Sequence, residues 1–172
     1  GTYNVKNRNS ANDIIKEMVD KRVEKLDSLG APTGADREKM LIIASIAESE
    51  VNADEYYGKV VRVILNWQAK NMPLGIDSTV AYGLGTTADK LTDAMLQDAS
   101  NPYNTRVNTG LPPTPISNPG ESAIKAAMNP PEGDWLYFVT VNLTTGETKF
   151  ATTEDEFWKI REEYKNSNED AN

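Results

Sequence analysis

The sequence predicts a mostly helical α+β domain with short antiparallel β-hairpins and an ordered proline-rich loop. Apolar residues recur at helical spacing early in the chain, whereas the strand-like runs are short and bounded by glycine or polar turns. Five of the nine prolines fall within residues 98–120, a density that regular elements do not tolerate. The 172 residues suffice for one domain with a buried core.

Helices are expected in the N-terminal part of the chain, after an extended segment over residues 1–9. The first begins at Ser10, with an acidic residue three positions later, and ends before Gly30. A second helix is expected over about 33–50 and a third over about 52–71, both with apolar inner faces. The apolar positions of the first helix are Ile14, Ile15, Met18, Val19, Val23 and Leu26.

The middle of the chain is expected to hold a short hairpin. Residues 78–84 (S-T-V-A-Y-G-L) are rich in strand-forming residues, and a return strand is expected around Lys90 and Leu91. Thr92 then caps a short helical turn.

Residues 98–120 form the proline-rich segment. Side chains such as Leu111 and Ile116 are too apolar for a free linker, so we expect a conformationally locked loop. Loops of this kind commonly carry function.

The C-terminal part is expected to alternate between helix and hairpin. A helix follows Pro119 and ends before Pro130. Residues 135–141 are the clearest strand, and residues 147–150 return as its hairpin partner. Thr153 with a glutamate three positions later predicts a capping box for the last helix.

Composition excludes several kinds of chemistry. The chain has no histidine and no cysteine, so catalytic triads that use them, histidine or thiolate metal sites and disulfides are excluded. The net charge of −8 argues against binding nucleic acid. No phosphate-binding glycine motif occurs, and the context of Lys70 and Lys125 does not favour a pyridoxal phosphate site. No cofactor and no metal are therefore expected.

Glu48 breaks the pattern of the second helix. It follows an almost unbroken apolar run, and Glu50 lies two residues later. Residues two apart point to different faces of a helix, so one carboxyl is expected inward and the other in solvent. Burial disfavours the charged form of a carboxyl group, and a carboxyl that stays protonated near neutral pH can act as a general acid. The alternative is that Glu48 is simply where the helix reaches the surface.

Other polar residues are candidates for recognition. Asp77 and Thr79 lie at the start of the strand expected over 78–84, where an aspartate commonly caps a turn. Tyr103, Asn104 and Thr105 together offer an aromatic face, an amide and a hydroxyl, a set that suits sugar binding. The same set suits hydrogen bonds within the loop equally well.

A series of motifs resembles one known family. The run A-S-I-A-E-S-E at residues 44–50 resembles the A-S-I-x-E-x-E motif of the endolytic murein transglycosylases, also called MltG or YceG-like. Further matching segments follow in order at residues 66, 72–74, 77, 79, 82–83, 103–105, 110–113, 115–116, 118–120, 126–127, 129–130 and 136–139.

The resemblance implies an enzyme that cleaves peptidoglycan strands internally, at the MurNAc-β-1,4-GlcNAc bond, and leaves 1,6-anhydro-MurNAc ends. It implies a catalytic domain over 1–165, followed by a polar tail over 166–172. The full protein would carry an upstream membrane helix and a LysM-like subdomain. It would be held in the bacterial cell membrane by a single-pass anchor, with the catalytic domain extracytoplasmic and cell-wall synthases as partners.

The resemblance also implies roles for particular residues. Glu48 matches the catalytic glutamate of the family and is expected to act as general acid and base. Such a reaction needs one carboxyl group, because the C6 hydroxyl of the substrate is the nucleophile. Residues expected to contact the glycan or to orient Glu48 are Asn66, Asp77, Thr79, Tyr103, Asn104, Thr105, Leu111, Pro112 and Asn118.

The chain departs from the family pattern at several positions. Trp67 stands where the family usually has arginine, and Gly75 where it usually has glutamine. Ser78 replaces a usual proline, while Thr148 and Phe157 align with two histidines that relatives often carry. The changes at Trp67, Gly75 and Ser78 favour an alternative, a catalytically weak peptidoglycan-binding or scaffold module of the cell-wall elongation machinery, whereas the retained Glu48 disfavours it. A third interpretation, a soluble lyase using pyridoxal phosphate, predicts a yellow protein.

Overall fold

The structure is a computed structural model, and it describes residues 10–142 and 144–169. The extended segment expected over residues 1–9 lies outside the described residues. The chain divides into two compact units, residues 1–37 and residues 38–172. Its described part holds seven α-helices, a 3₁₀ turn and one two-stranded antiparallel sheet, which confirms the mostly helical α+β prediction.

In the first unit, helix α1 (Ala11–Ser28) begins at the predicted capping box. The Ser10 hydroxyl accepts from the N–H of Asp13, and the Asp13 carboxylate accepts from the N–H of Ser10. The apolar positions predicted on α1 are mostly exposed: Leu26 is buried, but Ile15 and Val19 are 59% and 55% exposed. The apolar spacing therefore predicted the helix correctly, but most of these apolar side chains are not buried.

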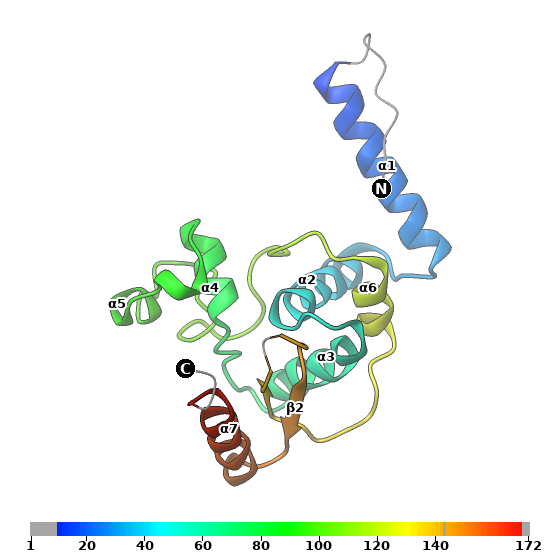
Figure 1. Cartoon of the computed structure of the whole chain (residues 1–172). Coiled ribbons are helices and arrows are strands. Elements are labelled where there is room, and N and C mark those ends of the chain that lie inside the picture. The colour runs from blue at the N-terminus through cyan, green and yellow to red at the C-terminus, as the bar shows by residue number, and fades with distance from the viewer. Residues whose placement is uncertain (1–9, 143, 170–172) are drawn as a thin grey trace. The chain divides into compact units, whose positions relative to one another are not determined.

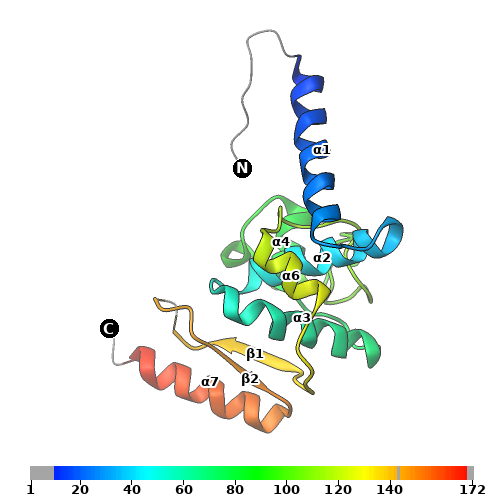
Figure 2. The same cartoon turned by 90° about the vertical axis from the view of Figure 1, so that its right-hand side faces the viewer.

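Three helices form the core of the second unit. Helix α2 (Gly34–Glu50) begins in the first unit and supplies buried residues from Met40 onward. Helix α3 (Asp54–Ala69) packs against α6 (Glu121–Met128), and α2 lies beside both (Figures 1 and 2). The third helix starts two residues later than expected, at Asp54, after an N-cap residue without a capping side chain.

The strand predicted over residues 78–84 is wrong, because these residues form helix α4 (Asp77–Leu84). The negative charge of Asp77 in the first turn interacts favourably with the positive end of the helix dipole. Gly85 ends the helix in the left-handed conformation, with φ 62°. The buried Thr79 satisfies its hydroxyl by donating to the Ile76 carbonyl. Tertiary packing has overridden the strand propensity of these residues.

The expected return strand near Lys90 and Leu91 is also wrong, since residues Ala88–Lys90 form the 3₁₀ turn η1. The short helix after Thr92 is confirmed as α5 (Asp93–Leu96), with the Thr92 hydroxyl accepting from the N–H of Met95. Residues 98–120 contain no helix or strand, as the prolines predict.

The C-terminal hairpin and helix lie on the side of α3. Strand β1 (Tyr137–Thr140) pairs with β2 (Thr148–Ala151), and helix α7 (Glu154–Glu169) packs on both strands. Figure 2 shows the hairpin between α3 and α7. The predicted capping box of α7 is present, and the helix extends four residues into the segment 166–172 expected as a polar tail.

Two side chains at the end of α3 tie this hairpin to the helical core. The Asn66 amide donates to the carbonyls of Gly133 and Trp135, at 2.9 Å each. The Trp67 indole N–H donates to the carbonyl of Leu136 at 2.8 Å. Asn66, expected to contact the glycan, thus holds the segment that leads into β1.

None of the described helices is long and apolar enough to cross a membrane.

The Asn66→Ala variant should lose about 1–3 kcal/mol of unfolding free energy, because it leaves two carbonyl groups without their donor. Urea denaturation measures the loss. The control is Asn129→Ala, which changes an exposed asparagine after α6. An equal loss in both variants would contradict this role for Asn66.

Candidate active site

The site is built on the C-terminal half of α2. Residues 42–47 are all buried, so this part of the helix is covered on every side. Glu48 follows directly and is half-buried. The helix therefore fixes the backbone of Glu48 while its carboxylate reaches the edge of the core.

A main-chain N–H of the proline-rich loop holds the Glu48 carboxylate. Oε2 of Glu48 accepts a hydrogen bond from the N–H of Gly120 at 2.8 Å. Gly120 is the N-cap residue of α6, so the carboxylate also lies at the positive end of that helix. A Cβ atom at position 120 would lie 3.2 Å from Oε1, which makes glycine the residue that allows this approach.

Ser45 attaches the same loop to α2 from inside the core. Its fully buried hydroxyl donates to the Ile42 carbonyl at 2.7 Å and accepts from the N–H of Ile116 at 3.0 Å. The Ser117 hydroxyl returns a hydrogen bond to the Ser45 carbonyl at 3.1 Å. Ser45 and Glu48 together hold both ends of the loop segment 116–120.

Tyr57 of α3 is a buried phenol near Glu48. Burial raises the pKa of its hydroxyl, and the negative charges of Asp54 and Glu48 raise it further. Tyr57 is therefore close enough to the Glu48 carboxylate to interact with it electrostatically, as a neutral hydroxyl.

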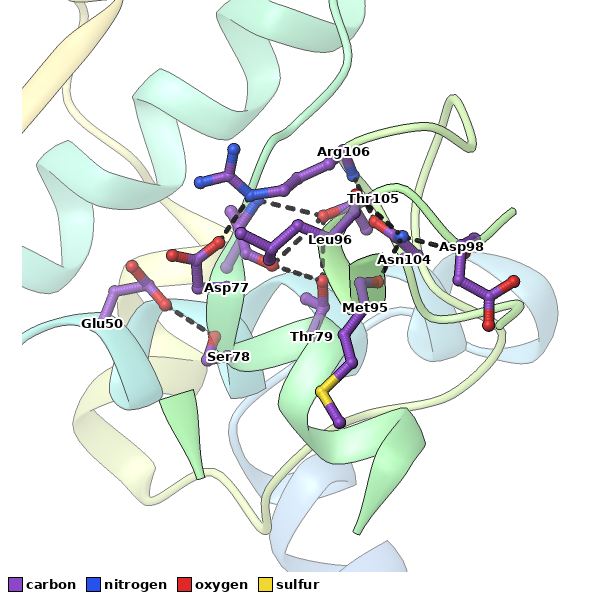
Figure 3. Close-up of polar contacts among 11 residues, drawn as sticks. Glu50, Asp77, Ser78, Thr79, Met95, Leu96, Asp98, Asn104, Thr105 and Arg106 are labelled. Carbon is purple, nitrogen blue, oxygen red and sulfur yellow. Dashed lines mark hydrogen bonds and ion pairs between the residues drawn. The ribbon is translucent and has the colours of Figure 1, made fainter. Parts of the chain in front are cut away.

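The second carboxyl of α2, Glu50, lies against α4. Its Oε1 accepts from the Ser78 hydroxyl at 2.6 Å (Figure 3). Burial raises the pKa of Glu50, the Ser78 hydrogen bond opposes that shift, and the nearby charge of Asp77 adds to it. The two carboxyls do point to different partners: Glu50 is the more deeply buried of the two, whereas the contact of Glu48 with Gly120 lies in an exposed position.

Three of the predicted site residues meet beside Glu50. Asp77 forms an ion pair with Arg106, with Nε 2.6 Å from Oδ1. The hydroxyls of Thr79 and Thr105 lie 2.8 Å apart, and Thr105 accepts from the N–H of Ile76 at 3.1 Å (Figure 3). Both threonines are buried, so their contacts join α4 to the loop after α5.

Asn104 and Tyr103 make hydrogen bonds within the loop. The Asn104 amide is fully buried and donates to the carbonyls of Met95, Leu96 and Asp98, between 2.9 and 3.3 Å away. The Tyr103 hydroxyl lies 2.8 Å from that of Thr114. Of the two roles expected for these residues, the structure shows hydrogen bonds within the loop. Contact with the glycan stays a prediction.

The remaining predicted residues belong to the proline-rich loop. Leu111 is half-buried and Pro112 is buried, whereas Asn118 is exposed and lies two residues before Gly120.

Among the described residues, no group of three or more acidic side chains is placed to hold a metal ion.

Sequence reasoning missed three residues around Glu48: Ser45, Tyr57 and Gly120. Ser45 and Gly120 belong to matched motifs, but small residues carry no signal of a long-range contact. In the sequence, nothing distinguishes Tyr57 from an ordinary aromatic residue on a helix face. Their roles come from contacts between segments about 70 residues apart in the chain, or between neighbouring helices.

Comparison with known proteins places the chain in a family. The model of the YceG-like family matches residues 1–163. The chain belongs to the YceG-like family. A solved structure of a yceG-like protein from Listeria monocytogenes is similar, with a TM-score of 0.79 and 38% identity over 93% of this chain and 53% of that one.

Curated relatives carry a more specific name. An endolytic murein transglycosylase of Bacillus subtilis is 37% identical over 90% of this chain and 43% of its own length. One from Streptococcus pneumoniae strain D39 is 27% identical over 96% of this chain and 31% of its own length. The chain thus spans less than half the length of these curated relatives.

The Ser45→Ala variant should be destabilised by about 1–3 kcal/mol, because the buried N–H of Ile116 loses its acceptor. Ser49→Ala is the matched control, since Ser49 is an exposed residue of the same helix whose hydroxyl donates to the Ser45 carbonyl. Urea denaturation of both variants compares the losses. A loss in Ser49→Ala as large as in Ser45→Ala would contradict the anchoring role.

Glu50 should make the stability depend on pH. Its pKa in the folded chain is raised above the ordinary 4.5, so the folded state holds more protons above pH 4.5 than the unfolded state does. Stability then falls as the pH rises through this interval. Glu50→Gln cannot ionise, so its stability relative to the unsubstituted chain should rise between pH 4 and pH 7.

Unfolding free energies at several pH values check this expectation. The exposed Glu147→Gln is the control for the loss of one negative charge. A difference between Glu50→Gln and the unsubstituted chain that stays constant with pH would contradict a raised pKa at Glu50.

Proposed function

We propose that this chain is the catalytic part of an endolytic lytic transglycosylase, which cleaves the MurNAc-β-1,4-GlcNAc bond within peptidoglycan strands and leaves 1,6-anhydro-MurNAc ends. One observation carries the proposal. Glu48 lies at the end of a buried helical run, at the motif position of the catalytic glutamate, and its carboxylate is held by the Gly120 N–H. The names of the curated relatives support the same reaction.

The mechanism needs a single carboxyl group. Protonated Glu48 donates its proton to the glycosidic oxygen as the bond from C1 breaks, and an oxocarbenium-like transition state develops. The C6 hydroxyl of the same sugar then forms a new bond to C1 and gives its proton to the Glu48 carboxylate. The carboxyl ends the cycle protonated, and no water is consumed.

The surroundings of Glu48 suit both of its states. The Gly120 N–H binds Oε2, which leaves Oε1 to carry the transferred proton. When the proton has left, the N–H and the positive end of α6 stabilise the carboxylate. The nearby Tyr57 hydroxyl is neutral, so it adds no competing negative charge.

The place of action is part of the proposal. Because peptidoglycan is extracytoplasmic, we propose that the longer protein is anchored in the bacterial cell membrane by a single segment, with this domain outside and cell-wall synthases as neighbours. The greater length of the curated relatives leaves room for such a segment. Membrane fractionation of the full-length protein tests the anchor.

The Glu48→Gln variant should release anhydro-muropeptides about 10²–10⁴ times more slowly, because glutamine keeps the shape and loses the acid. Mass spectrometry of digests of purified sacculi measures the product. The control is Glu55→Gln, an exposed glutamate in the first turn of α3.

Undiminished release by Glu48→Gln would overturn the mechanism. An unsubstituted chain that binds sacculi but yields no anhydro ends would instead select the scaffold module, the alternative suggested by the departures from the family pattern.

A further inference from the structure

A cavity of about 310 Å³ lies beside Glu50, at the C-terminal end of α2. The Glu48 carboxylate points elsewhere, to Gly120, so the cavity is distinct from the contact that holds the acid. In a regular helix the Cα atoms of residues two apart are roughly 5 Å from one another. The cavity therefore begins close to Glu48, on the neighbouring face of the same helix, and its volume is at the lower end for small-molecule sites.

The aromatic wall of the cavity comes from three elements and from both faces of β1: Trp67 of α3 with Phe138 on one face, and Phe157 of α7 with Tyr137 on the other. The rings of Trp67 and Phe138 lie 6.2 Å apart, and those of Tyr137 and Phe157 lie 5.2 Å apart. All four are half-buried, so they are held in place while part of each remains accessible. Fixed rings of this kind offer apolar surface to a ligand at little cost in entropy.

The other wall carries two carboxyl groups, those of Glu50 and Asp77. Asp77 is also paired with Arg106, which offsets part of its charge. Ser78 binds Oε1 of Glu50, and Figure 3 shows the other carboxyl oxygen turned toward Asp77. Burial raises the pKa of Glu50, which favours its neutral form more than in an exposed glutamate. The wall thus offers carboxyl oxygens that can accept hydrogen bonds from a ligand.

We propose that this cavity binds one N-acetylglucosamine unit of the glycan strand, with the sugar against the aromatic wall and its hydroxyl or acetamido groups on Glu50 and Asp77. This inference rests on the proposed function, because the occupant is a unit of the proposed substrate. An uncharged amphipathic ring matches both walls, whereas an anionic ligand would be repelled by the two carboxyls. The cavity would thereby fix the position of the strand relative to Glu48.

Trp67 and Gly75, which differ from the family pattern, both line this cavity. Gly75 adopts a φ of 64°, so its backbone conformation favours glycine. These two departures thus concern the surface that we assign to sugar binding and leave Glu48 intact.

The test uses the tetramer of N-acetylglucosamine as the ligand and the Glu48→Gln chain as the parent, so that no cleavage occurs. Calorimetric titration should show binding to the parent, and the indole N–H signal of Trp67 should shift in NMR spectra. Adding Tyr137→Leu should weaken binding about tenfold, because one wall loses its ring. Adding Glu50→Gln should preserve binding, since the amide still donates and accepts, whereas Glu50→Ala should weaken it severalfold.

The matched control is Tyr56→Leu, which removes a half-buried aromatic residue that packs on Phe150 and does not line the cavity. It should bind the tetramer like the parent. Unchanged binding in a folded Tyr137→Leu chain, or loss of binding with Glu50→Gln equal to that with Glu50→Ala, would overturn the proposal.

The two proposals fail separately. If Glu48→Gln abolishes anhydro products while Tyr137→Leu leaves binding unchanged, the reaction stands and the cavity assignment fails. If the chain makes no anhydro products but Tyr137→Leu still weakens tetramer binding, the cavity assignment stands and the proposed reaction fails.

Discussion

The burial of α2 on all sides is the constraint on which the candidate site depends. A helix that is apolar over residues 42–47 must be covered by several elements at once, and the buried Ser45 binds the proline-rich loop directly. The same loop then reaches Gly120, whose N–H meets Glu48. Covering the helix and holding the proposed acid are therefore consequences of one packing arrangement.

The hairpin and α7 complete a second face of this arrangement. Asn66 and Trp67 connect α3 to the segment before β1, and Trp67 also contributes to the cavity beside Glu50. Two carboxyls in one helix thus face two environments: Glu48 meets a main-chain donor, and Glu50 meets a hydroxyl and an aromatic cavity. This division gives the proposed enzyme separate places for proton transfer and for sugar binding.

The sequence predicted the parts of this molecule that local signals determine. Capping residues at Ser10, Thr92 and Thr153 marked helix starts correctly, since a cap is made by residues three apart. Helix α4 was missed because its residues favour a strand, and the Thr79–Thr105 contact that supports the helix joins residues 26 positions apart. Glu48 was found because it interrupts an apolar run, whereas the burial of Glu50 depends on where α4 packs.

The hydrogen bond from Gly120 has a consequence for how the sequence of this loop can vary. Its donor belongs to the main chain, so side-chain exchanges elsewhere in the loop leave it in place, whereas at position 120 a Cβ would crowd the carboxylate and proline would remove the donor. Loop length between Ile116 and Gly120 is thus fixed more tightly than loop composition, because Ser45 holds one end and Glu48 the other. Engineered libraries in this loop should therefore keep the number of residues between the two anchors and exchange side chains only.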